Sequence, residues 1–336
     1  MRFEERAVTD AAGAILLHNV ADADGARVLR KGILLNDEHL AHLVERGVAR
    51  VQVAILADDD VHEDEAARAL AAAMQTDELE LAPSVGGRVN LRATADGLLE
   101  VDAERLLAFN MLPGIALATR RQHTVVGPNQ ETDNIATMKI VPFAIARRDL
   151  DRALALASAR PGFIEVRAFQ PGRQAALMLV GEPAVHDKLR ASFEAPTRTR
   201  LEGLRAVLSI VEGVEQGEEA IAEAAVRLAE HVDLVIIAGQ TSVMNEEDST
   251  LRALRQAGAE MTLSGAPVEP GNLLALAYLP STPVLCAPGC ARGLRRNVMD
   301  VVLPRLLLGD RLDRHEIAAW GLGGFLSAVE RAGDST

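Results

Sequence analysis

The chain has 336 residues, 49% of them hydrophobic and 25% charged, a composition typical of a soluble globular protein with two or three domains. Aromatic residues make up only 3%, which argues against base stacking on single-stranded nucleic acid. The 35 basic and 48 acidic residues give a net charge of −13, which argues against a broad electrostatic grip on nucleic acid or an anionic membrane.

The sequence carries no sign of secretion or of a membrane span. Its two cysteines, Cys286 and Cys290, are too few for a disulfide framework, which fits a reducing compartment. The opening residues, MRFEER, lack the apolar segment of a signal peptide. The longest apolar runs fall far short of the ~20 residues that a membrane span needs. We therefore expect a cytoplasmic protein without membrane contact.

The first 171 residues combine short strands with few helices, which predicts an α+β region of one or two small lobes. Asp60 is placed to cap a helix, with Glu63 at the capping-box position, and Asp102 precedes another helical segment. The predicted strands are residues 15–20, 27–35, 51–56, 88–94, 98–101, 115–119, 135–145 and 163–169, and the predicted helices are residues 36–45, 60–74, 101–110 and 149–158.

From residue 172 strands and helices alternate, which predicts an α/β domain with an open, mostly parallel sheet and helices on both faces. We place this domain at residues 172–312, followed by a C-terminal helix and tail at 313–336. In such sheets ligands bind at the carboxyl ends of the strands. The predicted strands are residues 175–180, 205–211, 233–238, 273–279 and 283–287, and the predicted helices are residues 186–203, 217–231, 248–257, 297–308 and 314–331.

A candidate binding loop follows the predicted strand 233–238. Gly239 allows close backbone approach, Thr241 and Ser242 offer hydroxyl groups, and the next helix points its N-terminus at the same place, which favours an anion. The alternative is an ordinary loop in which Asn245 caps the helix and Asp248, three residues later, interacts favourably with its dipole.

A second candidate loop follows the predicted strand 283–287. Pro288-Gly289 forms a turn, and Arg292, Arg295 and Arg296 fall at the start of the predicted helix. Arginines there oppose the helix dipole, so they suggest a bound anion. The alternative is a basic surface patch paired with carboxylates. Residues 268–272 form a further turn by composition.

Two other motifs have simpler interpretations. Cys286 and Cys290 could form a redox pair, but we interpret them as two buried, inert thiols, and none of the eight histidines lies near in sequence to complete a four-ligand zinc site. The run of residues 62–65, HEDE, has the composition of a metal site, and we interpret it as the solvated start of a helix.

Four blocks of this sequence together resemble the molybdopterin-binding domain shared by molybdopterin adenylyltransferases and molybdenum insertases. The blocks are DLVIIAGQTS (233–242) with Asp248, GAE (258–260), PVEPGNLL (267–274) and PVLCAPG (283–289). The resemblance covers about residues 172–310. Residues 60–66, DVHEDEA, and 138–143, MKIVPF, are similar to the region that precedes this domain in insertase-like proteins.

The resemblance implies a three-layer α/β/α domain that binds the dithiolene and phosphate of the pterin at the strand ends. Gly239, Thr241 and Ser242 would line the phosphate loop. Asp248 would be the acidic residue that handles metal, as Mg²⁺, or nucleotide, with Glu246 as a second catalytic candidate. The flanking turns would supply Pro270, Gly271, Asn272, Pro288 and Gly289. To these the helix-terminus argument adds Arg292 and Arg296.

The resemblance implies a cytoplasmic protein that binds molybdopterin or molybdenum cofactor and acts in cofactor biosynthesis or delivery. If it is catalytic, the chemistry would be adenylyl transfer, metal insertion or Mg²⁺-assisted hydrolysis at a pterin phosphate. The alternatives are a non-catalytic carrier or sensor, and a nucleotide pyrophosphatase-type hydrolase. Expected partners are a pterin, a nucleotide, a second copy of the chain, and molybdoenzymes or cofactor-biosynthesis proteins, but no nucleic acid.

Overall fold

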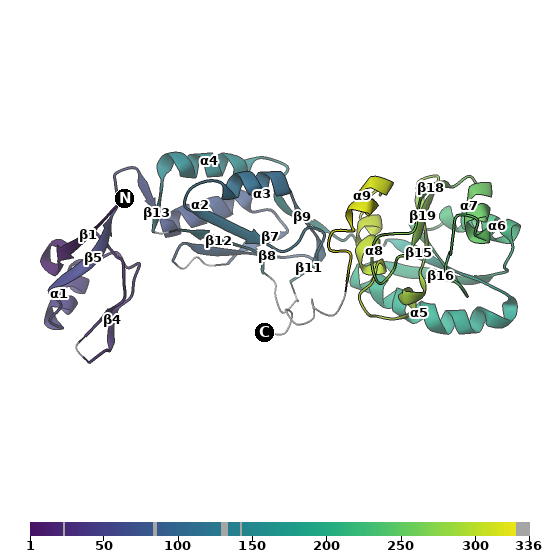
Figure 1. Cartoon of the computed structure of the whole chain (residues 1–336), viewed down its shortest axis with the longest axis horizontal. Coiled ribbons are helices and arrows are strands. Elements are labelled where there is room, and N and C mark those ends of the chain that lie inside the picture. The colour runs from purple at the N-terminus through teal and green to yellow at the C-terminus, as the bar shows by residue number, and fades with distance from the viewer. Residues whose placement is uncertain (23, 83–85, 129–133, 142, 327–336) are drawn as a thin grey trace. The chain divides into compact units, whose positions relative to one another are not determined.

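The computed structural model describes residues 1–22, 24–82, 86–128, 134–141 and 143–326 (Figure 1). Its chain divides into two compact units, Met1–Arg167 and Ala168–Thr336. Residue 142 of the MKIVPF block and residues 327–336 of the predicted C-terminal tail lie outside the described residues.

The first unit begins with a three-stranded antiparallel sheet in the order β1-β5-β2. Asn36 caps the helix beside it by accepting a hydrogen bond from the His39 amide, as its short polar side chain favours. Leu16, Leu43 and Val53 lie in the small core. The elements are β1 Arg2–Ala7, η1 Val8–Asp10, β2 Ile15–Leu16, β3 Val20–Ala21, β4 Arg27–Leu29, α1 Asp37–Glu45 and β5 Arg50–Ile55.

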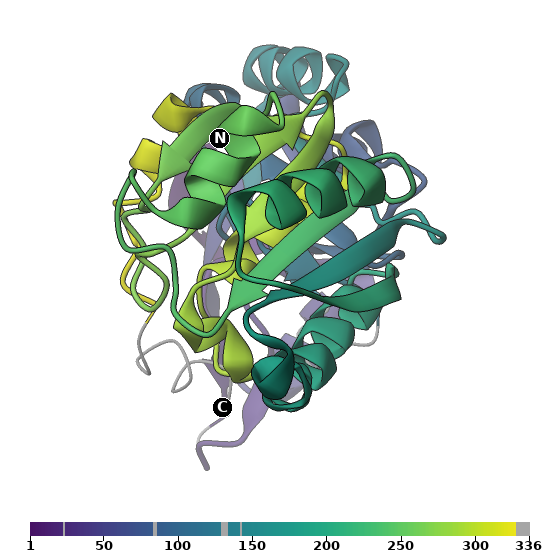
Figure 2. The ribbon, with the colours of Figure 1, turned by 90° about the vertical axis from the view of Figure 1, so that its right-hand side faces the viewer.

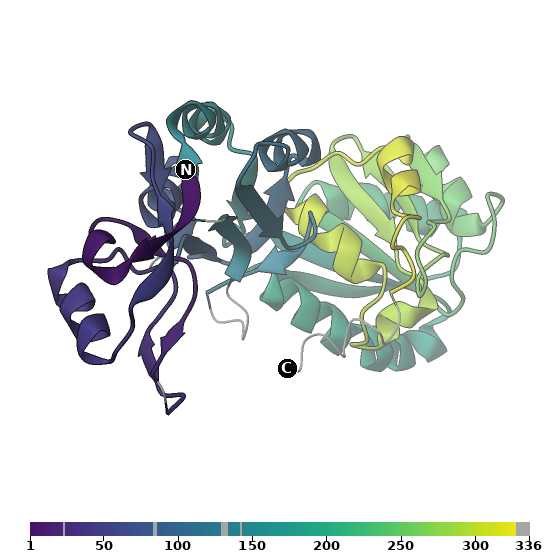
Figure 3. The same cartoon turned by 60° about the vertical axis from the view of Figure 1, so that its left-hand side comes forward.

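The larger part of the first unit contains a four-stranded sheet in the order β10-β12-β8-β7, with α2 packed against it (Figure 3). Two small sheets, β11-β9-β14 and β13-β6, complete this α+β region. The elements are β6 Asp60–His62, α2 Glu63–Met74, β7 Leu79–Leu81, β8 Arg88–Ala93, β9 Gly97–Val101, α3 Ala103–Asn110, β10 Ile115–Thr119, β11 Val125–Val126, β12 Asn134–Ile140, β13 Ala144–Ala146, α4 Arg147–Ser158 and β14 Ile164–Ala168.

One predicted helix cap in this unit is wrong and another is confirmed. Asp60 does not cap α2 but belongs to β6, where its carboxylate accepts a hydrogen bond from the Ala57 amide at 2.8 Å and pairs with the amino group of Met1 at 2.7 Å. His62 caps α2 instead, and Glu63 is its first residue. Asp102 caps α3 as predicted, accepting from the Arg105 amide at 3.0 Å.

The second unit is built on a six-stranded sheet in the order β16-β15-β17-β20-β19-β18. Strands β15, β16, β17 and β20 run parallel, and β19 is antiparallel to both of its neighbours. The predicted mostly parallel sheet is thus confirmed. The strands are β15 Gln174–Val180, β16 Val207–Val214, β17 Leu234–Gly239, β18 Glu260–Ser264, β19 Ala275–Leu279 and β20 Thr282–Cys286.

Helices cover both faces of this sheet (Figure 2). On one face α6 and α7 pack onto a core that includes Met178, Ile237 and Val284. On the other, α5 packs against β15, β16 and β17, and an ion pair between Arg200 and Asp300 joins it to α8. The helices are η2 Pro183–Val185, α5 His186–Gly203, α6 Glu218–Ala229, α7 Ser249–Gln256, η3 Gly289–Arg292, α8 Met299–Leu307 and α9 Arg314–Ala319.

The predicted C-terminal helix is shorter than its amphipathic pattern indicates. Asp313 caps α9, but the helix ends at Ala319, ahead of Gly321, Gly323 and Gly324, whose freedom of φ and ψ disfavours a helix. Among the described residues, none of the helices has the length and apolar character needed to cross a membrane.

Candidate functional site

The four parallel strands of the second unit end along one edge of the sheet. Val180 lies opposite Val214 on one side and Gly239 on the other, so β15 is flanked by the strands that follow it in sequence. The connections after β15 and after β16 therefore run to opposite faces. Such a reversal opens a crevice at the carboxyl ends of the central strands, where ligands of open α/β sheets bind. The fold brings the loops that carry the predicted site residues to this edge.

A histidine fixes the ends of β15 and β16 at this edge. The Nε2 atom of His186 donates to the carbonyl oxygens of Gly181 at 2.8 Å and Val214 at 3.3 Å. A Cβ at Gly213 would lie 2.3 Å from the histidine Nδ1, so only glycine leaves room for the ring. Because Nε2 faces two carbonyl acceptors, it carries a proton.

The first candidate loop, residues 239–248, begins with a tight turn and ends in a helix cap. A Cβ at Gly239 would lie 3.0 Å from the Thr241 carbonyl oxygen, which is closer than almost any side chain tolerates. Thr241 is exposed and Ser242 half-buried. The exposed side chain of Glu246 lies beyond them, and its carbonyl oxygen accepts from Arg255.

Asp248, not Asn245, caps the helix that follows this loop. Its Oδ1 accepts from the Thr250 amide at 2.9 Å, and α7 begins at Ser249. Asn245 instead accepts from the Glu247 amide at 2.9 Å in a local Asx turn. The sequence offered two good cap residues three positions apart, and the Asx turn delays the helix to the second one.

The second candidate loop, residues 287–298, does not present its arginines on the first turns of a helix, so that prediction is wrong. A short 3-10 turn, η3, ends at Arg292, Gly293 adopts an extended conformation with φ −113° and ψ 163°, and α8 begins only at Met299. Arg292, at the end of η3, and Arg296, in the loop after it, are exposed and do not share one face of a helix.

Arg292 connects the two loops. Its guanidinium donates to the carbonyl oxygens of Gly239 at 3.4 Å and Gln240 at 3.1 Å, and lies 4.9 Å from the centre of the Phe193 ring. The Ser242 hydroxyl accepts from the Gly289 amide at 2.8 Å. The two loops, which the sequence predicts separately, are thus joined by hydrogen bonds, with the Arg292 guanidinium between them.

The third turn joins the start of α8. Glu269-Pro270 is a cis peptide, and the Val298 amide donates to the Pro270 carbonyl oxygen at 3.0 Å. Gly271, at φ +131°, packs so closely that a Cβ there would lie 2.3 Å from the Val298 Cγ1. Asn272 is exposed, and its carbonyl oxygen accepts a hydrogen bond from the Ala266 amide. Pro288, in the second candidate loop, is buried.

Asp248 does not stand in a group suited to a metal. One of its carboxylate oxygens caps α7, and the described part of the chain contains no group of three or more His, Cys, Asp or Glu side chains that could hold a metal ion. Its charge acts instead on a neighbour: burial, helped by this carboxylate, raises the pKa of the Cys286 thiol to about 12. Burial also raises the pKa of Cys290. These directions fit inert thiols better than a redox pair.

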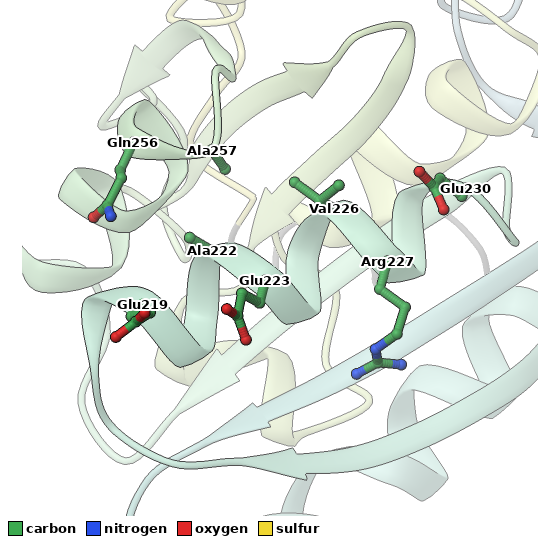
Figure 4. Close-up of a pocket in the computed structure, with 8 residues that line it drawn as sticks. All are labelled: Glu219, Ala222, Glu223, Val226, Arg227, Glu230, Gln256 and Ala257. Carbon is green, nitrogen blue, oxygen red and sulfur yellow. The ribbon is translucent and has the colours of Figure 1, made fainter.

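A hollow of about 470 Å³ lies away from these loops, on the outer side of α6 and the end of α7 (Figure 4). Its floor includes Ala222 and Val226, and Glu219, Glu223 and Glu230 stand around it. None of the predicted site residues lines it. Arg227 also lines it, and with three glutamates the groove carries a net negative charge, which disfavours a phosphate.

Sequence reasoning missed the residues of α5 that organise the second loop. Arg200 and Phe193 lie seven positions apart, two turns along the helix, and both are buried. They occupy one face of α5, below the loop of residues 289–297. The only available signal was an arginine among the apolar residues of a predicted helix. The contacts of that arginine with the second loop become visible only in the tertiary structure.

No family model matches the chain, and no curated protein matches it. It is similar to a molybdenum cofactor biosynthesis protein from Pyrococcus furiosus at 11% identity and a TM-score of 0.24, covering 92% of this chain and 64% of that one. It is also similar to the molybdopterin biosynthesis protein MoeA from Pyrococcus horikoshii, at 13% identity and a TM-score of 0.32, over 92% and 75% of the two chains. The molybdopterin biosynthesis enzyme MoaB from Thermus thermophilus matches at 16% identity and a TM-score of 0.31, over 41% and 98%.

These three structural neighbours are molybdopterin or molybdenum cofactor biosynthesis proteins. The chain spans 64% of the length of the first of them.

Proposed function

We propose that this protein binds molybdopterin or the molybdenum cofactor at the strand-end edge of its second unit, in the biosynthesis or delivery of that cofactor. The observation that carries the proposal is the joined pair of loops, in which Arg292 bridges Gly239 and Gln240 while Ser242 bonds to Gly289. The residues that resemble the molybdopterin-binding domain are the ones that meet there.

The chemistry of the edge suits a phosphorylated ligand. Exposed Arg292, Arg295 and Arg296 gather on one loop of a chain whose net charge is −13, so the local positive charge contrasts with the rest of the molecule. Thr241 supplies a hydroxyl donor beside them. Charge-assisted hydrogen bonds from such groups to a phosphate are about twice as strong as neutral ones.

Binding and delivery fit the residues better than hydrolysis. A pyrophosphatase-type reaction needs several carboxylates around a metal, and Asp248 is engaged as a helix cap, with Glu246 exposed nearby. Adenylyl transfer and metal insertion are two more specific reactions that the same site could support. For these, the chain's own residues would hold the pterin phosphate and orient it through the two linked loops.

A first experiment looks for the ligand directly. The protein is purified, denatured and oxidised, and the supernatant is examined for a fluorescent pterin that carries phosphate. A cofactor-binding protein releases one; its absence from protein expressed in a host that makes the cofactor, together with no binding of added ligand, would refute the proposal.

A second experiment tests the site. Arg292→Gln should weaken binding of the phosphorylated pterin by roughly 1.5–3 kcal/mol, about 10- to 150-fold, and scarcely change binding of the dephosphorylated form. The control is Arg311→Gln. Arg311 also lies over an aromatic ring, 4.2 Å from the centre of Tyr278, but Tyr278 pairs with Pro283 near the other end of β20. Equal losses of affinity in the Arg292→Gln and Arg311→Gln proteins would show that the phosphate does not bind beside Arg292.

A further inference from the structure

Arg200 of α5 is buried beneath the second loop, with 6% of its side chain exposed. Its guanidinium donates to the carbonyl oxygens of Ala291 at 3.2 Å, Gly293 at 2.7 Å and Arg295 at 3.2 Å. Its Nε donates to Asp300 at 2.9 Å. One side chain therefore satisfies alternate carbonyl groups along an irregular segment that has no secondary structure of its own after η3.

Asn297 completes this arrangement from the other end of the loop. Its side-chain nitrogen donates to the carbonyl oxygens of Cys290 at 3.2 Å and Arg295 at 2.9 Å, and its amide donates to Asp300 at 2.8 Å. Asn297 is itself 1% exposed. The inner side of the loop is thus lined by carbonyl oxygens that two buried side chains hold in place.

This arrangement has a consequence for the outer side of the loop. In a trans peptide the C=O of one residue and the N–H of the next point in opposite directions. Because the carbonyl groups of Gly293 and Arg295 turn inward to Arg200, the N–H groups of Leu294 and Arg296 turn outward, away from α5. The same helix face carries Phe193, on which the Arg292 guanidinium rests.

We propose that Arg200 is the positioning residue of the anion site. It holds the 289–297 loop so that the outward amide of Leu294 and the guanidinium of Arg292 face one phosphate group. This inference rests on the proposed function and deepens it, since it assigns part of the recognition of the phosphate to a backbone amide set by a residue that does not touch the ligand.

Lysine cannot replace Arg200 in this role. The guanidinium offers five N–H groups in a planar fork, which reach four separate acceptors here, whereas a lysine ammonium is a single point with three donors. Arg200→Lys keeps the charge beside Asp300 and releases part of the loop. The test therefore compares Arg200→Lys with the wild-type full-length chain.

Arg305→Lys is the matched control. Arg305 is also buried, with 11% of its side chain exposed, and forms ion pairs with Asp310 and with Glu316, the latter at 3.0 Å, but it contacts the end of α8 rather than the loop. Both variants exchange a buried, paired arginine for lysine. A general loss of stability should therefore affect them alike, as urea unfolding would measure.

Two readouts separate positioning from stability. The first is the ratio of affinities for the oxidised fluorescent pterin with and without its phosphate, by titration. The second is hydrogen exchange at amides 292–296. We expect Arg200→Lys to lose about tenfold in affinity for the phosphorylated pterin, to keep its affinity for the dephosphorylated one, and to exchange faster in the loop. Arg305→Lys should show neither effect.

The outcomes also distinguish this inference from the proposed function. If the wild-type protein binds the phosphorylated pterin and Arg200→Lys binds it equally well, the inference is overturned while the function stands. If the wild-type protein binds neither pterin, the proposed function and the phosphate role fail together. Unchanged exchange at amides 292–296 in Arg200→Lys would overturn the positioning of the loop whatever the ligand.

Discussion

Gly271 lies where the third turn meets α8, and replacing it with alanine tests whether this contact is as close as the structure indicates. The new Cβ would lie 2.3 Å from Cγ1 and 2.4 Å from Cβ of Val298. Carbon atoms in contact normally stay about 3.5–4.0 Å apart, so the two segments must separate by roughly 1 Å or more. That movement would also stretch the hydrogen bond from the Val298 amide to Pro270.

Two costs add in this variant. Overpacking of a closed contact costs about 1–3 kcal/mol, and a non-glycine residue held at φ +131° costs about 1–3 kcal/mol more. Gly271→Ala should therefore lower the free energy of unfolding by roughly 2–6 kcal/mol. Gly258→Ala separates the two terms, because Gly258 has φ +80° and nothing within 4 Å of its notional Cβ. We expect that control to lose only about 1–2 kcal/mol.

Urea unfolding followed by circular dichroism measures both variants against the wild-type chain. Gly271→Ala should be the less stable of the two by about 1 kcal/mol or more. A Gly271→Ala protein as stable as the Gly258→Ala protein would show that the turn and α8 are not in contact as described. Pterin titration of the same variant then reports whether that contact matters for the site.

Three further predictions concern the second unit. Asp248→Asn should keep the helix cap and lose at most about 1 kcal/mol of stability, whereas Asp248→Ala should lose about 0.5–2 kcal/mol, as thermal melts would show; equal losses in the two variants would mean that its charge, not its cap, is structural. In a Cys290→Ser background, Cys286 should resist thiol reagents at pH 8 until urea unfolds the protein, because burial raises the pKa of its thiol to about 12, and rapid labelling of the folded protein would contradict this. The hydrogen bond from Arg198 is the largest effect that lowers the pKa of Glu194 below its ordinary value of 4.5, so its stabilisation is present above that pH and is lost as the pH falls through the lowered value. Glu194→Gln should then destabilise the protein by a few tenths of a kcal/mol at pH 7 and not at pH 2, measured by urea unfolding at both pH values.

The regular part of the second unit could be predicted because its signals are local. Strand β17 is an unbroken apolar run, as expected for a strand buried on both faces, and the glycine at its end marks the turn. Strands β1 and β18 were missed for the opposite reason. Their sequences, RFEERA and EMTLS, lack a continuous or alternating apolar pattern, and the strands exist because a neighbour pairs with them.

The candidate site was predicted in outline but not in geometry. The sequence predicted Gly239 and Gly289 after strands of one mostly parallel sheet, which is enough to bring their loops to one edge. It could not tell that Asn245 would form an Asx turn, or that the arginines would lie on an irregular loop. The course of the arginine loop depends on Arg200, almost a hundred residues earlier in the chain, and on a contact that appears only once α5 packs on the sheet.

His186 and Gly213 carry a consequence for how this protein can vary over evolution. The imidazole fits only because position 213 has no side chain, and its hydrogen bonds join the ends of the parallel strands β15 and β16. A mutation of Gly213 alone creates a clash, and a mutation of His186 alone removes the donor to the Gly181 carbonyl oxygen and one of two donors to that of Val214. Drift at these two sites should therefore be coupled, so that descendants either retain the His–Gly pair or replace both members and hold the strand ends by other means.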